Sequence, residues 1–276
     1  MPDTNPTLHS LIRCFACGAA LSFSPAGVRL CCDGEGGSVL RNGFLIHDPG
    51  LGKSPTPEML VRDSDARHYI SHPKFPPQID RLASFLRTHV SPGDRVLDLG
   101  CGPGPTTEML LRAAADAVAV DFSVPSLALN ARLCGALAER ALFVQADLNT
   151  IQFTDSAFDG LMMADFLQHL GGKKTQRDFL DKSFRALKPG GWFYLSFFNT
   201  NMFHRLTRDR SGIRGNIGYR RTSLAEVHTM LPGGIVAENE YVMNICDQAA
   251  ADRIASRLPF ASLLARMAVI EGRRLR

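Results

Sequence analysis

Hydrophobic residues in the middle of the chain gather in short continuous runs, separated by segments with helical spacing. Short apolar runs without polar alternation are typical of strands buried on both faces. The strands predicted in this way are Val96–Leu99, Ala117–Asp121, Ala141–Gln145, Phe158–Met163 and Trp192–Phe198. Strands that alternate with helices indicate an α/β fold with a mostly parallel, doubly wound sheet.

Apolar residues at intervals of three and four predict the helices. The helices expected are Glu58–Tyr69, Pro76–Val90, Thr106–Arg112, Pro125–Leu137, Arg177–Leu187, Ser223–Met230 and Gln248–Leu258. Towards the end of the chain, Ile235–Met243 is expected to be extended and Ala265–Glu271 to be a closing strand.

The first part of the chain differs from the rest in composition. Residues 10–48 contain short extended runs, cysteines and Asn42-Gly43, a pair that favours a hairpin turn. Residues 49–57 are dense in proline and glycine, which is typical of a linker. We therefore expect a small β module at 10–48, a linker at 49–57 and the α/β domain at 58–276.

Composition limits the class of protein and the compartment to be expected. The chain has 276 residues with 45% hydrophobic and 21% charged residues, as in soluble globular proteins. Its apolar runs are shorter than the roughly 18 residues that suggest a membrane span, and the N-terminus lacks the pattern of a secretory signal. We expect a cytoplasmic protein without a membrane partner, and the composition leaves its oligomeric state open.

The stretch from Arg95 to Gly104 combines an apolar strand with a glycine-rich turn. Gly100, Gly102 and Gly104 lack the Cβ that would keep a ligand from the backbone. A helix follows, and its first N–H groups point back at the turn. Asp98 lies within the apolar run, where an unpaired carboxylate would be costly to bury. This arrangement is typical of a nucleotide-binding turn.

Two further acids follow the next two strands. Asp121 ends one strand and Asp147 comes just after the other, so both are expected at the carboxyl edge of the sheet, where ligands bind. Asp121 can accept the hydroxyls of a ribose, and Asp147 can meet the amine of an adenine flanked by Phe122 and Leu148. An adenosine is implied.

A nicotinamide dinucleotide is the competing ligand, because its fingerprint is Gly-x-Gly-x-x-Gly. Counted from Gly100, the third glycine of that fingerprint would stand at Pro105. Asp98 inside the strand is also no part of it. The residues instead form Asp-x-Gly-x-Gly-x-Gly.

Val96 to Gly104 resembles the first motif of class I S-adenosylmethionine-dependent methyltransferases. Asp121, Asp147, the stretch 158–169 and the turn 187–192 resemble later motifs of this family, in order and over residues 70–200. The resemblance implies a seven-stranded Rossmann-like sheet and S-adenosyl-L-methionine as cofactor. The residues expected to bind the cofactor are Asp98, Gly100, Cys101, Gly102, Gly104, Asp121, Phe122, Asp147, Leu148 and Ala164.

Methyl transfer to a hydroxyl or a protonated amine needs a base. His169, which follows the fourth strand, is the best candidate, and Asp165 is the second. The alternative for His169 is a packing role that closes the cofactor pocket.

The segment 199–221 follows the fifth strand, where the acceptor is expected. It holds six arginines and the single acid Asp209. This composition fits a lid that clamps an anionic metabolite, an RNA-binding surface or a solvated basic loop. The residues expected to contact the acceptor are Tyr69, His204, Arg214, Tyr219 and Arg220.

The charges of the 10–48 module balance to zero, whereas an RNA-binding module is normally basic. We therefore favour a small or medium-sized, anionic metabolite as acceptor. The alternative is ribosomal RNA, because the layout also resembles the ribosomal RNA guanine-N1 methyltransferases. A scaffold that binds the cofactor without transferring its methyl is the third hypothesis, and the unbroken glycine motif argues against it.

Cys14-x-x-Cys17-Gly18 resembles one knuckle of the zinc ribbon found before some bacterial methyltransferases. The second pair is Cys31-Cys32, and the positions that would complete a Cys-x-x-Cys are Gly34 and Glu35, so the ribbon is degenerate. Cys14, Cys17, Cys31 and Cys32 are the candidate ligands for one structural zinc. The alternative is a module that packs without metal.

Overall fold

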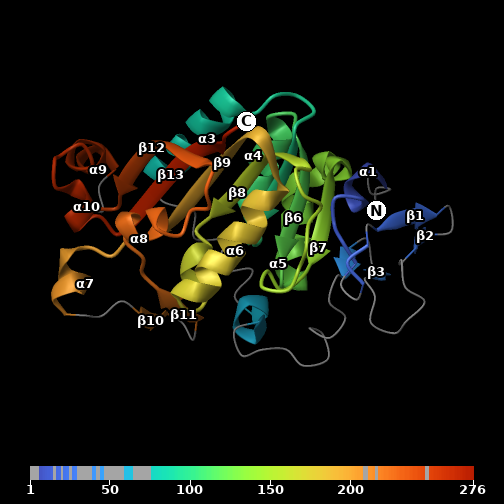
Figure 1. The fold of residues 1–276 in the computed structure, drawn as a ribbon, viewed down its shortest axis with the longest axis horizontal. Helices are drawn as coiled ribbons and strands as arrows, with labels where there is room; N and C mark the ends of the chain where they lie inside the picture. Colours follow the sequence, from blue (N-terminus) through green and yellow to red (C-terminus); the bar gives the residue numbers. More distant parts are fainter. Residues whose placement is uncertain are drawn as a thin grey trace.

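The protein is built on one large mixed sheet (Figure 1). The computed structural model describes residues 6–14, 17–19, 21–24, 27–29, 39–41, 44–46, 59–64, 76–207, 211–214, 217–245 and 249–276. The sheet has nine strands in the order β12-β13-β9-β8-β5-β6-β7-β4-β3. Its layout confirms the mostly parallel α/β fold.

Five parallel strands form the centre of the sheet. They are β5 (Arg95–Leu99), β6 (Asp116–Asp121), β7 (Ala141–Gln145), β8 (Phe158–Ala164) and β9 (Leu187–Phe198). The chain runs from β5 outward through β6 to β7, then returns to add β8 and β9 on the other side of β5. Strand order therefore reverses between β5 and β8, and a ligand site is expected outside their carboxyl ends.

Helices cover both faces of this sheet. On one face, α3 (Pro76–His89), α4 (Pro105–Arg112) and α5 (Val124–Cys134) pack on alternate strand residues such as Val96 and Ala119. On the other face, α6 (Lys173–Ala186) covers residues that include Leu97 and Phe193. Because successive strand residues point to opposite faces, both clusters require apolar strands, which explains the unbroken hydrophobic runs.

Two antiparallel strands close the edge next to β9. β13 (Met267–Arg274) pairs with β9, and β12 (Ile235–Met243) pairs with β13. β12 has the bounds predicted from the sequence. The short helix α8 (Leu224–His228) leads into it and begins with a capping box made by Ser223 and Glu226.

The prediction of seven strands is wrong, because the N-terminal part of the chain contributes two more. The hairpin of β3 (Val39–Arg41) and β4 (Phe44–Ile46) joins the sheet, with β4 parallel to β7. An unpaired edge at β7 would leave its N–H and C=O groups open, and β4 satisfies them. A separate hairpin joins β1 (Ser22–Ser24) and β2 (Gly27–Arg29).

The beginning of the chain packs on the same core as the sheet. The helix α1 (Pro6–His9) is followed by Ile12, which is fully buried and bridges to Phe153. The Arg13 N–H donates to the Gln152 carbonyl at 3.0 Å. The expected module boundaries at 48 and 57 lie outside the described residues.

The segment after β9 forms its own small elements. They are α7 (Met202–Leu206) and a hairpin of β10 (Ser211–Arg214) and β11 (Ile217–Arg220). Two further helices, α9 (Ala249–Ala255) and α10 (Ala261–Leu264), precede β13. Figure 1 shows α7, α9 and α10 together at one end of the molecule.

Helix ends are the least accurate part of the sequence prediction. α5 stops at Cys134, and a 3₁₀ turn, η1 (Gly135–Arg140), replaces its predicted last turn because Gly135 has a φ of +56°. α6 begins at Lys173, one turn earlier than expected. The predicted helix 58–69 is helical over 59–64, and residues 65–75 are outside the described part.

We predict that Gly160→Ala destabilises the protein by about 1–3 kcal/mol, as overpacking of a core does. Gly160 lies in β8, and an added Cβ would come within 2.1 Å of the Trp192 ring. Urea unfolding measures the effect. The control is Gly233→Ala, where an added Cβ meets no atom within 4 Å. Equal stability of both variants would contradict the packing described for Trp192.

Candidate functional site

The glycine turn after β5 is fixed by main-chain bonds to the neighbouring strand. The N–H groups of Gly100 and Cys101 both donate to the Val120 carbonyl, at 2.9 and 3.1 Å. Gly100 and Gly102 have φ values of +68° and +53°, which residues with a Cβ rarely adopt. Gly104 has a φ of −87° and precedes Pro105 at the start of α4, so it serves as the helix cap.

Gly100 is required for a second reason, which is its contact with Phe166. A Cβ on Gly100 would lie 2.4 Å from the Phe166 ring, so this ring rests directly on the turn. At Gly102, by contrast, an added Cβ would meet no atom within 4 Å. Gly102 therefore borders open space, as the backbone of a ligand cradle must.

Asp98 supports the glycine turn through a chain of hydrogen-bonded polar side chains. Its carboxylate is 1% exposed and accepts a bond from the Thr107 hydroxyl at 2.7 Å. The Asn130 amide donates to Thr107 at 2.9 Å and to the Gly102 carbonyl at 3.0 Å. Asp98, expected among the cofactor residues, thus connects β5, α4, α5 and the turn. Beside it, burial raises the pKa of the Cys101 thiol well above its usual value.

Asp121 ends β6 and faces the same turn. Its two carboxylate oxygens accept from the N–H of Gly102 and from the N–H of Ser123, each at 2.9 Å. Burial raises the pKa of Asp121, while these two bonds and the positive charge of Arg62 oppose the rise. The carboxylate is therefore oriented beside the turn, where further donors would stabilise its charge.

Asp147 lies at the corresponding place after β7. Its carboxylate accepts from the main-chain N–H of Asn149 at 2.8 Å, which fixes the loop that carries the buried Leu148. Lys182 of α6 donates to the carbonyls of Leu148 and Asn149 at 2.6 and 3.0 Å. Burial lowers the pKa of Lys182 to about 8, although the charge of Asp147 opposes this.

A cavity of about 90 Å³ lies between these loops. Its walls include five of the predicted cofactor residues, which are Gly100, Asp121, Phe122, Asp147 and Leu148. Phe166, His169 and Leu170 close it on the other side. Ala164, the last residue of β8, pairs with Ser196 of β9 and is not part of this wall.

His169 stands at the boundary between the cavity and the segment 199–221. It ends a 3₁₀ turn, η2 (Leu167–His169), and its Nδ1 lies 3.2 Å from the Gly218 carbonyl. The Gln168 amide nitrogen, which can only donate, lies 3.4 Å from His169 Nε2. Nδ1 therefore carries the proton, and the lone pair of Nε2, which a base would use, accepts the long contact from Gln168.

Burial lowers the pKa of His169 to about 4, and the charge of Arg62 adds to this effect. The bond to Gly218 and the charge of Asp165 oppose it without reversing it. The imidazole is consequently neutral at pH 7. Its environment is compatible both with a weak base and with the packing role.

An aromatic wall extends from His169 towards the hairpin. The His169 and Phe198 rings meet edge to face at 6.4 Å, and Phe198 meets Tyr219 in the same way at 5.6 Å. The Arg221 guanidinium lies 4.7 Å from the centre of the Tyr219 ring, within the range of a cation–π contact. Tyr219, a predicted acceptor residue, is thus connected to the predicted base.

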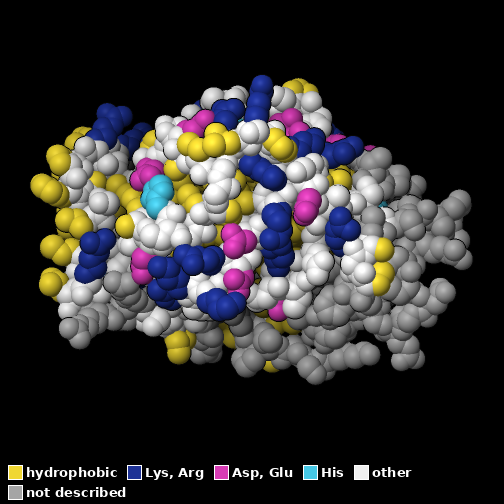
Figure 2. Space-filling view, viewed as in Figure 1, with side chains coloured by type: hydrophobic (Ala, Val, Ile, Leu, Met, Phe, Trp, Pro, Cys, Tyr) yellow, Lys and Arg dark blue, Asp and Glu magenta, His cyan; other side chains and the backbone are white. Residues whose placement is uncertain are grey.

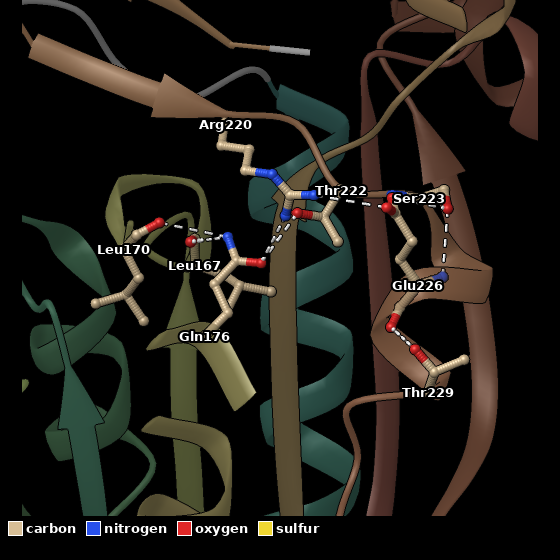
Figure 3. Close-up of polar contacts among 8 residues, drawn as sticks. All are labelled: Leu167, Leu170, Gln176, Arg220, Thr222, Ser223, Glu226 and Thr229. Atoms are coloured by element: carbon tan, nitrogen blue, oxygen red, sulfur yellow. Dashed lines mark hydrogen bonds and ion pairs between the residues drawn. The ribbon is translucent and has the colours of Figure 1, made fainter. Parts of the chain in front are cut away.

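Gln176 of α6 joins the two ends of this wall (Figure 3). Its amide nitrogen donates to the carbonyls of Leu167 and Leu170, at 3.0 and 3.4 Å, and so holds η2. Its amide oxygen accepts from Arg220 at 3.2 Å and from Thr222 at 3.3 Å. One buried side chain therefore connects the His169 turn to the chain that follows β11.

Arg220, predicted to contact the acceptor, is engaged within the protein. Besides Gln176, its guanidinium lies 3.5 Å from a carboxylate oxygen of Glu226 (Figure 3). Glu226 in turn completes the capping box of α8. The contacts of Arg220 are those of a residue that positions the hairpin.

Asp165, the second candidate base, follows β8 and has a φ of +60°, a strained value that aspartate tolerates better than most residues. Its carboxylate accepts from the Ser196 hydroxyl at 2.6 Å and from the Gln78 amide of α3. Its own carbonyl accepts from Gln168 at 2.6 Å. These bonds orient Asp165 and its turn, and they engage both oxygens of its carboxylate.

The remaining predicted acceptor residues lie apart from the cavity or outside the description. His204 is on α7, where its ring contacts Phe203 at 5.7 Å. Arg214 is in β10, and its side chain is outside the described part. Tyr69 also lies outside it.

The zinc prediction is not tested by the structure. Cys14 is buried and Cys17 is exposed, on a turn where the Gly18 N–H donates to the Cys14 carbonyl at 2.9 Å. Cys31 and Cys32 lie outside the described residues. Within the described ranges, no three His, Cys, Asp or Glu side chains are grouped as metal ligands.

Three contributors to the site were missed in the sequence. Arg62, in the helical turn 59–64, acts electrostatically on both Asp121 and His169. Its neighbour Asp63 accepts from the Ser123 hydroxyl at 2.5 Å, which places this turn beside β6. Phe166 could have been suspected as an aromatic residue after the fourth strand, but nothing in the sequence indicated Gln176.

Comparisons with known proteins agree with this geometry. Residues 97–195 match the family model described as "Methyltransferase domain". The demethylmenaquinone methyltransferase of Clavibacter sepedonicus is 34% identical over 124 residues, which cover 45% of this chain and 49% of the relative. The chain thus spans about half the length of the demethylmenaquinone methyltransferases it matches.

Residues 97–195 are therefore similar to a methyltransferase domain. They contain the glycine turn, Asp121, Asp147 and His169, so the cavity lies within the matched region.

Solved structures agree on the fold. The CcbJ methyltransferase of Streptomyces caelestis is 18% identical with a TM-score of 0.61, covering 78% of this chain and 98% of that one. The 1,6-didemethyltoxoflavin-N1-methyltransferase of Burkholderia thailandensis, solved with S-adenosylhomocysteine, is 18% identical with a TM-score of 0.57. It covers 88% of this chain and 97% of its own. The chain thus shares the fold of these two methyltransferases.

We predict that the imidazole of His169 remains neutral down to about pH 5, because burial lowers its pKa to about 4. NMR titration of ring-labelled histidines measures this, with His169→Gln assigning the signal. The exposed His228, for comparison, lies beside Glu240. A signal that titrates near pH 6.5 and disappears in His169→Gln would contradict the buried environment. Because the unfolded chain binds this proton near pH 6.5, native stability should fall as pH drops from there towards 4.

Proposed function

We propose that the protein transfers a methyl group from S-adenosyl-L-methionine to a small or medium-sized, anionic metabolite. The observation that carries the proposal is the position of Asp121 and Asp147 on one cavity, beside a glycine turn with open space at Gly102. Two carboxylates at neighbouring strand ends suit the hydroxyls of a ribose and the amine of an adenine. The match of residues 97–195 to a methyltransferase domain supports it.

The residues of the cavity fit the cofactor by their chemistry. Asp121 would accept the ribose hydroxyls, while Phe122 and Leu148 would flank the adenine. The bound cofactor supplies an electrophilic methyl on a positively charged sulfur. Because that charge disappears during transfer, the protein contributes mainly by positioning the acceptor and excluding water. Phe166 and Leu170 provide the apolar surface for this.

His169 is the residue we assign to the acceptor proton. Its Nε2 faces away from the Gly218 carbonyl and keeps a lone pair at neutral pH. Asp165 is the alternative base, but its carboxylate already accepts from Ser196 and Gln78. The bonds of Gln176 to η2 keep His169 in position during turnover.

The acceptor would lie against the aromatic wall of His169, Phe198 and Tyr219. A flat ring fits such a wall, and the charge of Arg221 beside Tyr219 favours a negative group on that ring. Two of the similar enzymes are named after demethylmenaquinone and 1,6-didemethyltoxoflavin, and both compounds are small molecules. No observation on the described residues favours RNA over such an acceptor.

We predict that Asp121→Asn weakens binding of S-adenosylhomocysteine about 10- to 100-fold, the usual loss when a charged hydrogen-bond acceptor is removed. Isothermal titration calorimetry measures the affinity. The matched control is Asp116→Asn at the other end of β6, where the carboxylate pairs with Arg140 far from the cavity. Unchanged affinity in Asp121→Asn would contradict the proposed cofactor site.

We further predict that His169→Gln lowers kcat about 10²- to 10⁴-fold with a hydroxyl acceptor, the range for loss of a general base. Release of S-adenosylhomocysteine during turnover of trial phenols and quinols measures the rate. If His169 only packs the pocket, KM for the cofactor rises while kcat stays within a few-fold. That result would remove His169 as the base and leave the cofactor site intact.

A further inference from the structure

One end of the molecule exposes an unusual number of large apolar side chains. Three come from α7, and four come from α9, α10 and the chain between them. They are Met202 at 47% exposure, Phe203 at 66%, Leu206 at 77%, Ile254 at 71%, Leu258 at 56%, Phe260 at 71% and Leu264 at 49%. We refer to these seven residues as the apolar surface. Figure 2 shows hydrophobic side chains gathered along the edge where Figure 1 places α9 and α10.

Hydrogen bonds join the segments that carry the apolar surface. The side chain of Asn199, which is 1% exposed, donates to the carbonyls of Ser262 and Ala265 at 2.7 and 3.0 Å. The Asn201 amide adds a contact to the Leu264 carbonyl at 3.5 Å, and its oxygen caps α7. These bonds hold α7 against α10, so the exposed side chains of both helices belong to one face.

The segments that carry the apolar surface bear exposed charges of one sign. Arg205 lies on α7 among the apolar residues, and Arg257 lies between Ile254 and Leu258; both are exposed. Within the described segments 201–207 and 251–266 the only acid is Asp252, which is 1% exposed and accepts bonds from the N–H groups of Asn244 and Ile245. The exposed charge of these two segments is therefore positive, and the exposed acid beside them is Asp80 of α3, which pairs with Arg253.

We propose that the apolar surface is a docking site for the surface of an anionic lipid bilayer. The apolar and aromatic side chains suit the acyl chains of such a bilayer. The arginines among them suit its phosphate groups. Phe203 and Phe260 enter the boundary layer, and Arg205 and Arg257 bind lipid phosphates. Among the described residues, no helix is long and apolar enough to cross a bilayer, so binding is peripheral.

Two other occupants fit the face less well. In a symmetric dimer the same patch meets itself, which would place arginines of both copies near one another without an exposed acid in these segments. A nucleic acid would satisfy the arginines but would leave the seven apolar side chains largely without apolar partners. Of these three occupants, the bilayer is the one that offers both kinds of contact. The surface was not foreseen in the sequence, from which we expected no membrane partner.

Cosedimentation with lipid vesicles tests the proposal without reference to catalysis. The full chain should bind vesicles of phosphatidylglycerol and phosphatidylcholine in equal parts, and bind weakly to phosphatidylcholine alone. The double variant Phe203→Ser/Phe260→Ser should reduce partitioning to anionic vesicles by about tenfold or more, because two aromatic side chains no longer enter the lipid. Arg205→Gln and Arg257→Gln should each reduce it about fivefold.

The control is Leu133→Ser, which replaces a 39% exposed apolar residue on α5. It should bind vesicles like the unmodified protein, and thermal melting should show all variants folded. Absence of binding to anionic vesicles, or equal binding by the double phenylalanine variant, would overturn the proposal. Sedimentation velocity adds a third arm: self-association that Phe203→Ser/Phe260→Ser abolishes would assign the surface to a second copy of the chain and overturn the bilayer assignment.

Discussion

The site depends on one short set of main-chain bonds between the glycine turn and the end of β6. The Val120 carbonyl accepts from both Gly100 and Cys101, and the next residue, Asp121, accepts from Gly102. These bonds form only when Gly100 and Gly102 adopt positive φ values, which is why glycine is needed there. They place the carboxylate and the turn on the same cavity, and the buried Asp98–Thr107–Asn130 chain holds them from the other side.

A second set of contacts holds the opposite wall of the cavity. Phe166 packs on Gly100, η2 carries His169, and Gln176 connects η2 to the end of β11. The helical turn 59–64 adds Arg62, whose positive charge favours the ionised form of Asp121 and the neutral form of His169. The charge of Arg62 thus favours the ionisation state that the proposal requires of each residue, a charged cofactor ligand and a neutral base.

Much of the fold could be predicted because the central strands are buried on both faces and therefore read as unbroken apolar runs. Asp121 and Asp147 were found because parallel strand ends share one edge. Arg62, Phe166 and Gln176 were missed because their roles arise from contacts between segments distant in sequence. The strand number was wrong for the same reason, since pairing of β4 with β7 joins positions about a hundred residues apart. Exposure of Phe203 and Phe260 also depends on how α7 and α10 meet.

A crystal structure with S-adenosylhomocysteine tests the central claim most directly. The account predicts that the ribose hydroxyls bind the carboxylate of Asp121, with the adenine between Phe122 and Leu148 and its amine at Asp147. It also predicts that the sulfur lies near Gly102 and faces the side of the cavity closed by Phe166 and His169. Adenosine bound at another place, or bound without contact to either carboxylate, would contradict the account.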